Sequence, residues 1–127
     1  MRKMLATTVA IGLTAAFGMT SVQAQPAKRY DPGTQTCRIL TQENLHHGYE
    51  LFQENCKSCH HRGNEQGADF LYSESKSMEG WNRVFGSKYP DCADEGKWDK
   101  LTRQELLIVN DYLFANAYDS NNPHCYV

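Results

Sequence analysis

The chain lacks an apolar run long enough to cross a membrane. Its longest apolar stretch, residues 4–19, covers about 16 residues, short of the roughly 20 that a spanning helix requires. Arg2 and Lys3 precede this stretch, and small and polar residues follow it up to Ala24. This order is typical of a secretory signal peptide. We therefore expect residues 1–24 to be removed, and a soluble product without a membrane anchor to be exported to the periplasm.

A surplus of basic residues is also missing. The whole chain carries 13 Lys and Arg against 15 Asp and Glu, and the expected signal peptide contains two basic residues and no acidic one. The other 103 of the 127 residues then hold 11 basic and 15 acidic side chains, a formal charge of about −4. We expect no nucleic-acid partner for such a chain, which is long enough for one small domain with a modest core.

No segment shows the alternation of β-branched and polar residues that is typical of a strand. Helical periodicity appears in residues 41–56, in residues 75–85, and in residues 102–117, where Thr102 and Glu105 form a capping box. The sequence thus predicts a small all-α fold of about three helices and long loops. We expect residues 25–40 to be a flexible lead-in, and residues 41–127 to form the domain with a polar C-terminal tail.

The stretch NCKSCHHRG, residues 55–63, holds the candidate chemistry. Cys56 and Cys59 are separated by two residues and His60 follows directly, a C-x-x-C-H pattern. Two thiols at this spacing can add across the two vinyl groups of one haem, and the adjacent histidine can bind the iron. A thioredoxin-type dithiol would begin a helix after a strand, and a zinc site would need a second Cys or His pair. Both therefore fit less well than a covalent haem.

The segments on either side of this motif resemble the class I monohaem c-type cytochromes. The stretch GYELFQENCKSCH is similar to their N-terminal helix and haem motif, and LTRQELLIVNDYL is similar to their C-terminal helix. The resemblance covers residues 41–117. It implies a cytochrome c-like fold around one covalent haem c, with His60 on the iron and two crossing helices that approach closely at Gly48, near Tyr112. It also implies a haem lined by six apolar side chains: Phe52, Leu71, Trp81, Phe85, Leu106 and Leu113.

The sixth iron ligand is less clear from the sequence. Family members mostly use a methionine shortly before the last helix, whereas Met78, the one methionine after the signal peptide, comes only 18 residues after His60. Met78 also shares a helical face with Trp81 and Phe85, where methionine commonly fills a core. The position that the family pattern selects holds Cys92, whose thiolate can also bind haem iron. Met78 is the first expectation and Cys92 the alternative. Histidines are weaker candidates: His46, His47, His61 and His124.

The chain has five cysteines, an odd number, so they cannot all form disulfides within one chain, and the sequence leaves the pairing open. If Cys92 binds iron, Cys37 and Cys125 remain to form a disulfide in an oxidising compartment. If Cys92 instead pairs with Cys37 or Cys125, the third thiol is free or links two chains in a dimer.

The expected function is that of an exported one-electron carrier rather than an enzyme, because a six-coordinate haem needs no substrate pocket. Its partners would be a redox donor and a redox acceptor. Two alternatives stand beside this expectation. The chain could be the haem subunit of a periplasmic oxidoreductase complex, or a haem enzyme or gas sensor with an open iron position.

Overall fold

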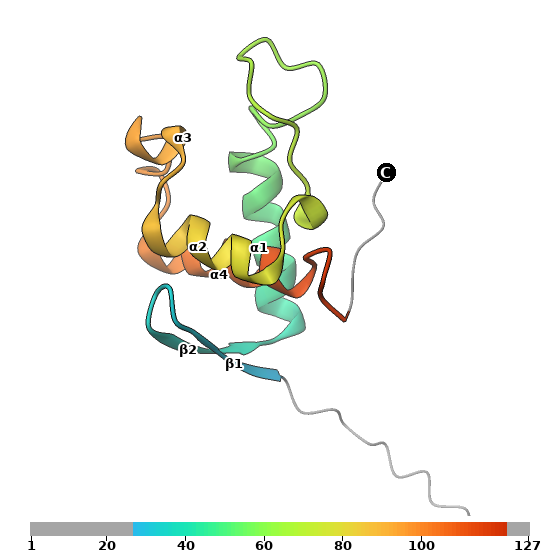
Figure 1. Cartoon of the computed structure of the whole chain (residues 1–127), viewed down its shortest axis with the longest axis vertical. Coiled ribbons are helices and arrows are strands. Elements are labelled where there is room, and N and C mark those ends of the chain that lie inside the picture. Colours follow the sequence, from blue (N-terminus) through green and yellow to red (C-terminus); the bar gives the residue numbers. More distant parts are fainter. Residues whose placement is uncertain (1–26, 122–127) are drawn as a thin grey trace, which may run out of the picture.

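The computed structural model describes residues 27–121, so the expected signal peptide and the end of the polar tail, with Cys125, lie outside the described residues. Three longer helices contain most of the helical residues of the described chain (Figure 1). No helix in this part of the chain is both long and apolar enough to cross a membrane. In chain order the elements are β1 (Ala27–Asp31), β2 (Thr36–Leu40), α1 (Gln42–Asn55), the short 3₁₀ helix η1 (Ser73–Ser75), α2 (Met78–Ser87), the short α3 (Asp91–Asp94) and α4 (Arg103–Ala115).

The expected crossing of the first and last helices is confirmed. In Figure 1, α1 stands upright and α2 and α4 lie across it. A Cβ added to Gly48 would come within 2.5 Å of the Ile108 carbonyl oxygen and within 2.7 Å of the Tyr112 Cβ. Such distances are below van der Waals contact, so only glycine allows the two backbones to approach this closely.

Each longer helix begins where a side-chain oxygen can cap its free N–H groups. Thr41 accepts from the Asn44 N–H, Ser77 accepts from the Gly80 N–H, and Thr102 accepts from the Glu105 N–H. The Glu105 carboxylate in turn accepts from the Thr102 N–H at 2.7 Å, which completes the predicted capping box. The end of α4 at Ala115 is two residues before the expected Ala117.

The three longer helices bury one apolar cluster between them. It contains Leu51 and Phe52 of α1, Trp81, Val84 and Phe85 of α2, and Val109, Tyr112 and Leu113 of α4. On the edge of this cluster Tyr49 is 38% exposed, and its ring contacts that of Tyr112 edge-on with centroids 5.6 Å apart.

The prediction of an all-α fold is wrong. Residues 27–40 form a two-stranded antiparallel hairpin, with Arg29 opposite Arg38 and Tyr30 opposite Cys37. The fold is therefore mixed, with helices and a small sheet. In Figure 1 the hairpin lies at the opposite end of the molecule from the loop that follows α1.

The hairpin was missed because its polarity is the reverse of a usual amphipathic strand. The face that packs on the helices carries Arg29, Asp31 and Arg38, and the outer face exposes Tyr30 and Ile39. Its turn is stabilised locally, since the Asp31 carboxylate accepts hydrogen bonds from the Gly33 N–H at 3.0 Å and the Thr34 hydroxyl at 2.7 Å. An alternation of buried charge and exposed apolar residues gives no ordinary strand signal.

A set of six buried polar side chains, here called the hairpin cluster, joins the hairpin to the helices. Arg29 Nε donates to Asp111 Oδ1 at 2.7 Å and Arg38 Nε donates to the same carboxylate at 2.9 Å. Arg38 Nη2 also donates to Asp31 at 3.1 Å, so two guanidinium groups face two carboxylates. The exposed fraction of each charged side chain is 9% or less. The members are Arg29, Asp31, Arg38, Asn82, Asn110 and Asp111.

Candidate cofactor-attachment site

The C-x-x-C-H motif lies where α1 ends, so its side chains are held on one tight turn. The Cys56 N–H continues the helix by donating to the Phe52 carbonyl at 2.9 Å. The N–H groups of Cys59 and His60 both donate to the Cys56 carbonyl, at 3.2 and 2.8 Å. Two thiols and one imidazole are therefore presented by five consecutive residues, as attachment to one planar group at two points requires.

The His60 ring is oriented by the loop that follows it. His60 Nδ1 lies 2.7 Å from the backbone carbonyl oxygen of Asp69. A carbonyl oxygen only accepts, so Nδ1 carries the proton and donates it, and Nε2 keeps its lone pair. The Leu71 N–H also donates to the His60 carbonyl at 3.2 Å, which ties the returning loop to the motif. This arrangement matches that of metal-binding histidines, whose second nitrogen commonly donates to a carbonyl or carboxylate.

The Cys56 thiol packs against the apolar cluster, and the structure also brings Cys92 near it. The pKa of Cys56 is raised to about 12, mainly by burial, with smaller contributions in the same direction from the nearby Cys92 and Cys59 and an opposing one from Lys100. In the folded chain Cys56 is thus a protonated thiol and a weak nucleophile. Cys37, Cys56, Cys59 and Cys92 are all free, so no disulfide joins Cys37 to Cys92 within the described residues. Pairing with Cys125 lies outside them.

The side chains expected to line a haem all belong to the same cluster. Phe52, Trp81, Phe85 and Leu113 are buried in it, and Leu71 and Leu106 pack against it half-buried. Trp81 Nε1 donates to the Ser73 carbonyl at 2.7 Å, and the Phe85 ring stacks on Trp98 with centroids 5.1 Å apart. These residues therefore gather beside Cys56, where they serve equally well as core and as the wall of an attached group.

The two candidates for a sixth ligand reach this region from different elements. Met78 is the first residue of α2, where its N–H donates to the Asp119 carboxylate at 2.8 Å and its side chain packs half-buried against the cluster. Cys92 lies in α3 and is close enough to affect the Cys56 thiol electrostatically. Cys92 thus lies near the motif, and Met78 packs against the apolar cluster that Cys56 also contacts.

The other described histidines lie at the surface. His46 and His47 are on the exposed face of α1, each within salt-bridge distance of Glu50. His61 is exposed, with its Nδ1 near the Arg62 carbonyl. His124 lies outside the described residues.

The donor set indicates what kind of metal centre fits. Within residues 27–121 no group of three or more His, Cys, Asp or Glu side chains is placed to hold a bare metal ion. His60 therefore offers a single oriented nitrogen, and an iron bound to it would need most of its ligands from elsewhere. A porphyrin brings four nitrogen ligands of its own, and Cys56 and Cys59 would be its attachment points. The residues present thus fit a covalent haem better than a protein-only metal site.

The hairpin cluster is the main feature that sequence reasoning missed. A usable signal was present in α4, where Asn110 and Asp111 interrupt the apolar stripe between Val109 and Tyr112. Polar residues on a buried helix face require partners, and among the described residues these are supplied by Arg29 and Arg38 of the hairpin and by Asn82.

A scan of the chain against protein-family models found no match, and searches among curated proteins and solved structures found no similar protein. The likeness to c-type cytochromes therefore rests on the motif and helix residues themselves.

Proposed function

We propose that this chain carries one haem c, bound covalently through Cys56 and Cys59 with His60 as an axial iron ligand, and that it works as an exported one-electron carrier. The observation that supports this best is the hydrogen bond from His60 Nδ1 to the Asp69 carbonyl, which leaves Nε2 directed by the loop and free to bind iron. It occurs one residue after a cysteine pair at the spacing of haem attachment.

The attachment chemistry balances without an added oxidant or reductant. Each thiol S–H bond breaks, a sulfur–carbon bond forms at one vinyl carbon, and the hydrogen ends on the other vinyl carbon. When bound, the haem supplies an iron that alternates between ferric and ferrous. Because folding buries the Cys56 thiol and raises its pKa to about 12, we place attachment before the chain reaches its folded form.

The protein residues keep that iron in a dry and rigid setting. Phe52, Trp81 and Phe85 are each 7% exposed or less, and they come from two helices that are fixed against α4. A rigid apolar surrounding limits the rearrangement that accompanies a change of charge. Electron transfer then needs only contact with a redox donor and a redox acceptor.

The sixth ligand separates the carrier from the two alternatives. Oxidised spectra of the wild type, Met78→Ala and Cys92→Ser are to be compared, together with cyanide or carbon monoxide binding to each. A carrier with Met78 on the iron loses its sulfur-to-iron absorption band only in Met78→Ala, and binds added ligands slowly until then. Loss of the sulfur ligand only in Cys92→Ser assigns Cys92. Fast ligand binding by the wild type would instead mean an open iron and would contradict the carrier.

Exposed aromatic residues around α3 favour the alternative in which the chain is a haem subunit of an oxidoreductase complex. Tyr89 is 55% exposed and precedes Pro90 and α3, and the half-buried Trp98 follows α3 in the chain. An aromatic surface of this kind is typical of contact regions between proteins. Size-exclusion chromatography of the native protein distinguishes the two: elution as a monomer supports the free carrier, and co-elution with a second polypeptide supports a complex.

A further inference from the structure

Lys57 lies between the two cysteines of the motif and holds the loop that follows it. Its Nζ donates to the Leu71 carbonyl oxygen at 2.8 Å. The same ammonium group lies 4.0 Å from the centroid of the Phe70 ring, within the range of a cation–π contact. Two contacts from one side chain thus fasten the returning part of the loop to the turn that carries the motif.

The segment that Lys57 holds is the one that orients the imidazole of His60. The Asp69 carbonyl accepts the proton of His60 Nδ1 at 2.7 Å, and the Leu71 N–H donates to the His60 carbonyl at 3.2 Å. Residues 69–71 are consecutive, and each peptide unit that joins them is planar and stiff. A displacement of Leu71 therefore carries the Asp69 carbonyl with it.

The rest of the loop is closed on itself and gives this segment no further support. The Asn64 side chain bonds to backbone groups within residues 61–68, at 2.6 to 3.0 Å. In Figure 1 the loop extends beyond the end of α1 at the top of the view. Among the described residues, Lys57 is the only side chain besides His60 that is hydrogen-bonded to the backbone of residues 69–71. The position of this segment therefore depends on Lys57 and on the ring beneath it.

We propose that Lys57 and Phe70 are positioning residues for His60. By holding the Asp69 carbonyl on His60 Nδ1, they lower the reduction potential of the bound iron. This inference rests on the proposed function, because the bond affects an iron only through His60 Nε2. The hydrogen bond makes the imidazole a more basic ligand, since the Nδ1 proton is drawn toward the carbonyl. A more basic ligand stabilises the ferric form and so lowers the potential.

The charge of Lys57 acts in the opposite direction. A cation near the iron disfavours the ferric form, so removal of the charge alone lowers the potential. Lys57 is half-buried, and solvent and salt weaken this effect. Loss of the hydrogen bond to His60 raises the potential instead. The sign of the change therefore distinguishes a positioning role from a purely electrostatic one.

Arg62 provides the matched control within the loop. Its Cζ lies 4.5 Å from the centroid of the same Phe70 ring. Within residues 27–121 the Arg62 side chain has no hydrogen bond and no ion pair. Arg62→Gln thus removes a cation beside Phe70 without removing a bond to residues 69–71.

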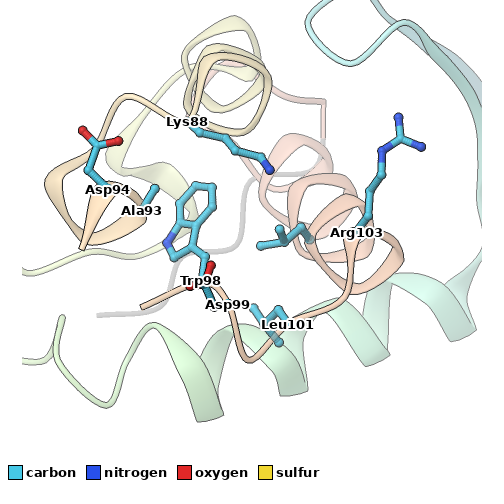
Figure 2. A pocket seen from close by; sticks show the side chains of 8 residues that line it. Lys88, Ala93, Asp94, Trp98, Asp99, Leu101 and Arg103 are labelled. Carbon is cyan, nitrogen blue, oxygen red and sulfur yellow. The ribbon is translucent and has the colours of Figure 1, made fainter. Parts of the chain in front are cut away.

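A cation outside the loop completes the set of controls. Arg103 lines a cavity of about 450 Å³ to which none of residues 57–72 contributes, and two basic and two acidic residues line that cavity. In Figure 2 the Arg103 guanidinium is directed away from the cavity, as the Asp94 carboxylate is. Arg103→Gln therefore removes one positive charge and leaves the contacts of the loop intact.

The test uses the full haem-loaded protein and four variants: Lys57→Met, Phe70→Leu, Arg62→Gln and Arg103→Gln. Covalent haem is first measured in each by mass and by absorption. The reduction potential is then recorded at neutral pH, and exchange of the His60 Nδ1 proton with solvent is followed by NMR in the ferrous protein. Phe70→Leu changes no charge and lies outside the motif, so it decides the question if Lys57→Met fails to take up haem.

Lys57→Met and Phe70→Leu are each expected to raise the equilibrium constant for reduction about threefold, which is about 28 mV for one electron. The His60 Nδ1 proton should exchange faster in both. Arg62→Gln and Arg103→Gln should leave the exchange unchanged and the potential equal or lower. Potentials and exchange rates equal to those of Arg62→Gln, at full haem content, would overturn the positioning role and leave the carrier standing. A wild type without covalent haem would overturn the proposed function and this inference together.

Discussion

The two ends of the molecule differ in how completely their polar groups are satisfied. At the hairpin end, two buried arginines and two buried aspartates share hydrogen bonds of 2.6 to 3.1 Å with one another and with Asn110. At the motif end lie the free thiols of Cys56 and Cys59 and an imidazole, that of His60, which is oriented by the Asp69 carbonyl. A closed network stabilises a fold and leaves nothing for a ligand, whereas unused donors indicate where a ligand belongs.

In a small domain, this difference lets one set of residues stabilise the fold while another set binds a cofactor. The hairpin cluster joins the hairpin to Asn82 of α2 and to Asn110 and Asp111 of α4. The motif end can then keep groups that are poorly satisfied in the bare polypeptide and that become satisfied by a bound cofactor. We infer that stability and binding depend on separate residues, and the variants below test this separation.

The largest effect is expected for Asp111→Ala. The change leaves Arg29 and Arg38 buried without their shared carboxylate, and breaking such a pair typically costs about 3–5 kcal/mol of unfolding free energy. Denaturant unfolding measures the loss, with the exposed Glu54→Ala as control and Asp111→Asn as the milder variant. Covalent haem per folded molecule should stay unchanged. A loss below about 1 kcal/mol, or folded protein without haem, would break the proposed separation.

A smaller loss is expected for Gly48→Ala. Alanine normally stabilises a helix interior by about 0.5–1 kcal/mol relative to glycine. Here the added methyl group would meet the Ile108 carbonyl and the Tyr112 Cβ, so we expect a net destabilisation of about 1–3 kcal/mol. Gly80→Ala is the matched control, since its methyl group meets mainly side-chain atoms at 3.1 and 3.2 Å. If Gly48→Ala proved as stable as this control, the close crossing of α1 and α4 would be disproved.

The smallest effect concerns the pH dependence of the hairpin. Burial alone would raise the pKa of Asp31, but hydrogen bonds from Thr34 and Arg38, the charge of Arg29 and the Gly33 N–H together lower it below its usual 3.8. A carboxylate with a depressed pKa stabilises the fold above its unfolded pKa and loses this contribution as the pH falls through its folded pKa.

Asp31→Asn should therefore be about 1 kcal/mol less stable than the wild type near neutral pH, since Arg38 keeps Asp111 as a partner. The difference should shrink below pH 3.8. Unfolding experiments from neutral to acidic pH give both curves. A difference that stayed constant down to the lowest pH would mean that the Asp31 charge contributes nothing.

The helices were predictable because local rules and packing agree in them. Thr102 and Glu105 predicted the start of α4, and the resemblance to c-type cytochromes implied the contact between α1 and α4 at Gly48, near Tyr112. The hairpin was not predictable in the same way. Its strands bury arginine and aspartate, and such burial is favourable only when Asp111 and Asn110 are already in place across the molecule.

In the candidate site, too, some features could be predicted from the sequence and others depend on tertiary contacts. The residue types and spacing of Cys56, Cys59 and His60 could be identified from the sequence, since all three lie within five consecutive residues on one turn. The orientation of the His60 ring depends on Asp69, and the nearness of Cys92 to Cys56 depends on how the segment around α3 packs. Contacts of this kind arise from tertiary structure, and no local sequence pattern encodes them.

The most direct test of the account is the intact mass of the chain purified from its native compartment. We predict a polypeptide beginning near Gln25 whose mass exceeds the calculated value by one haem, with the added mass located on the peptide that contains Cys56 and Cys59. A bare polypeptide in which these two cysteines are unmodified, or joined to each other, would contradict the proposed function.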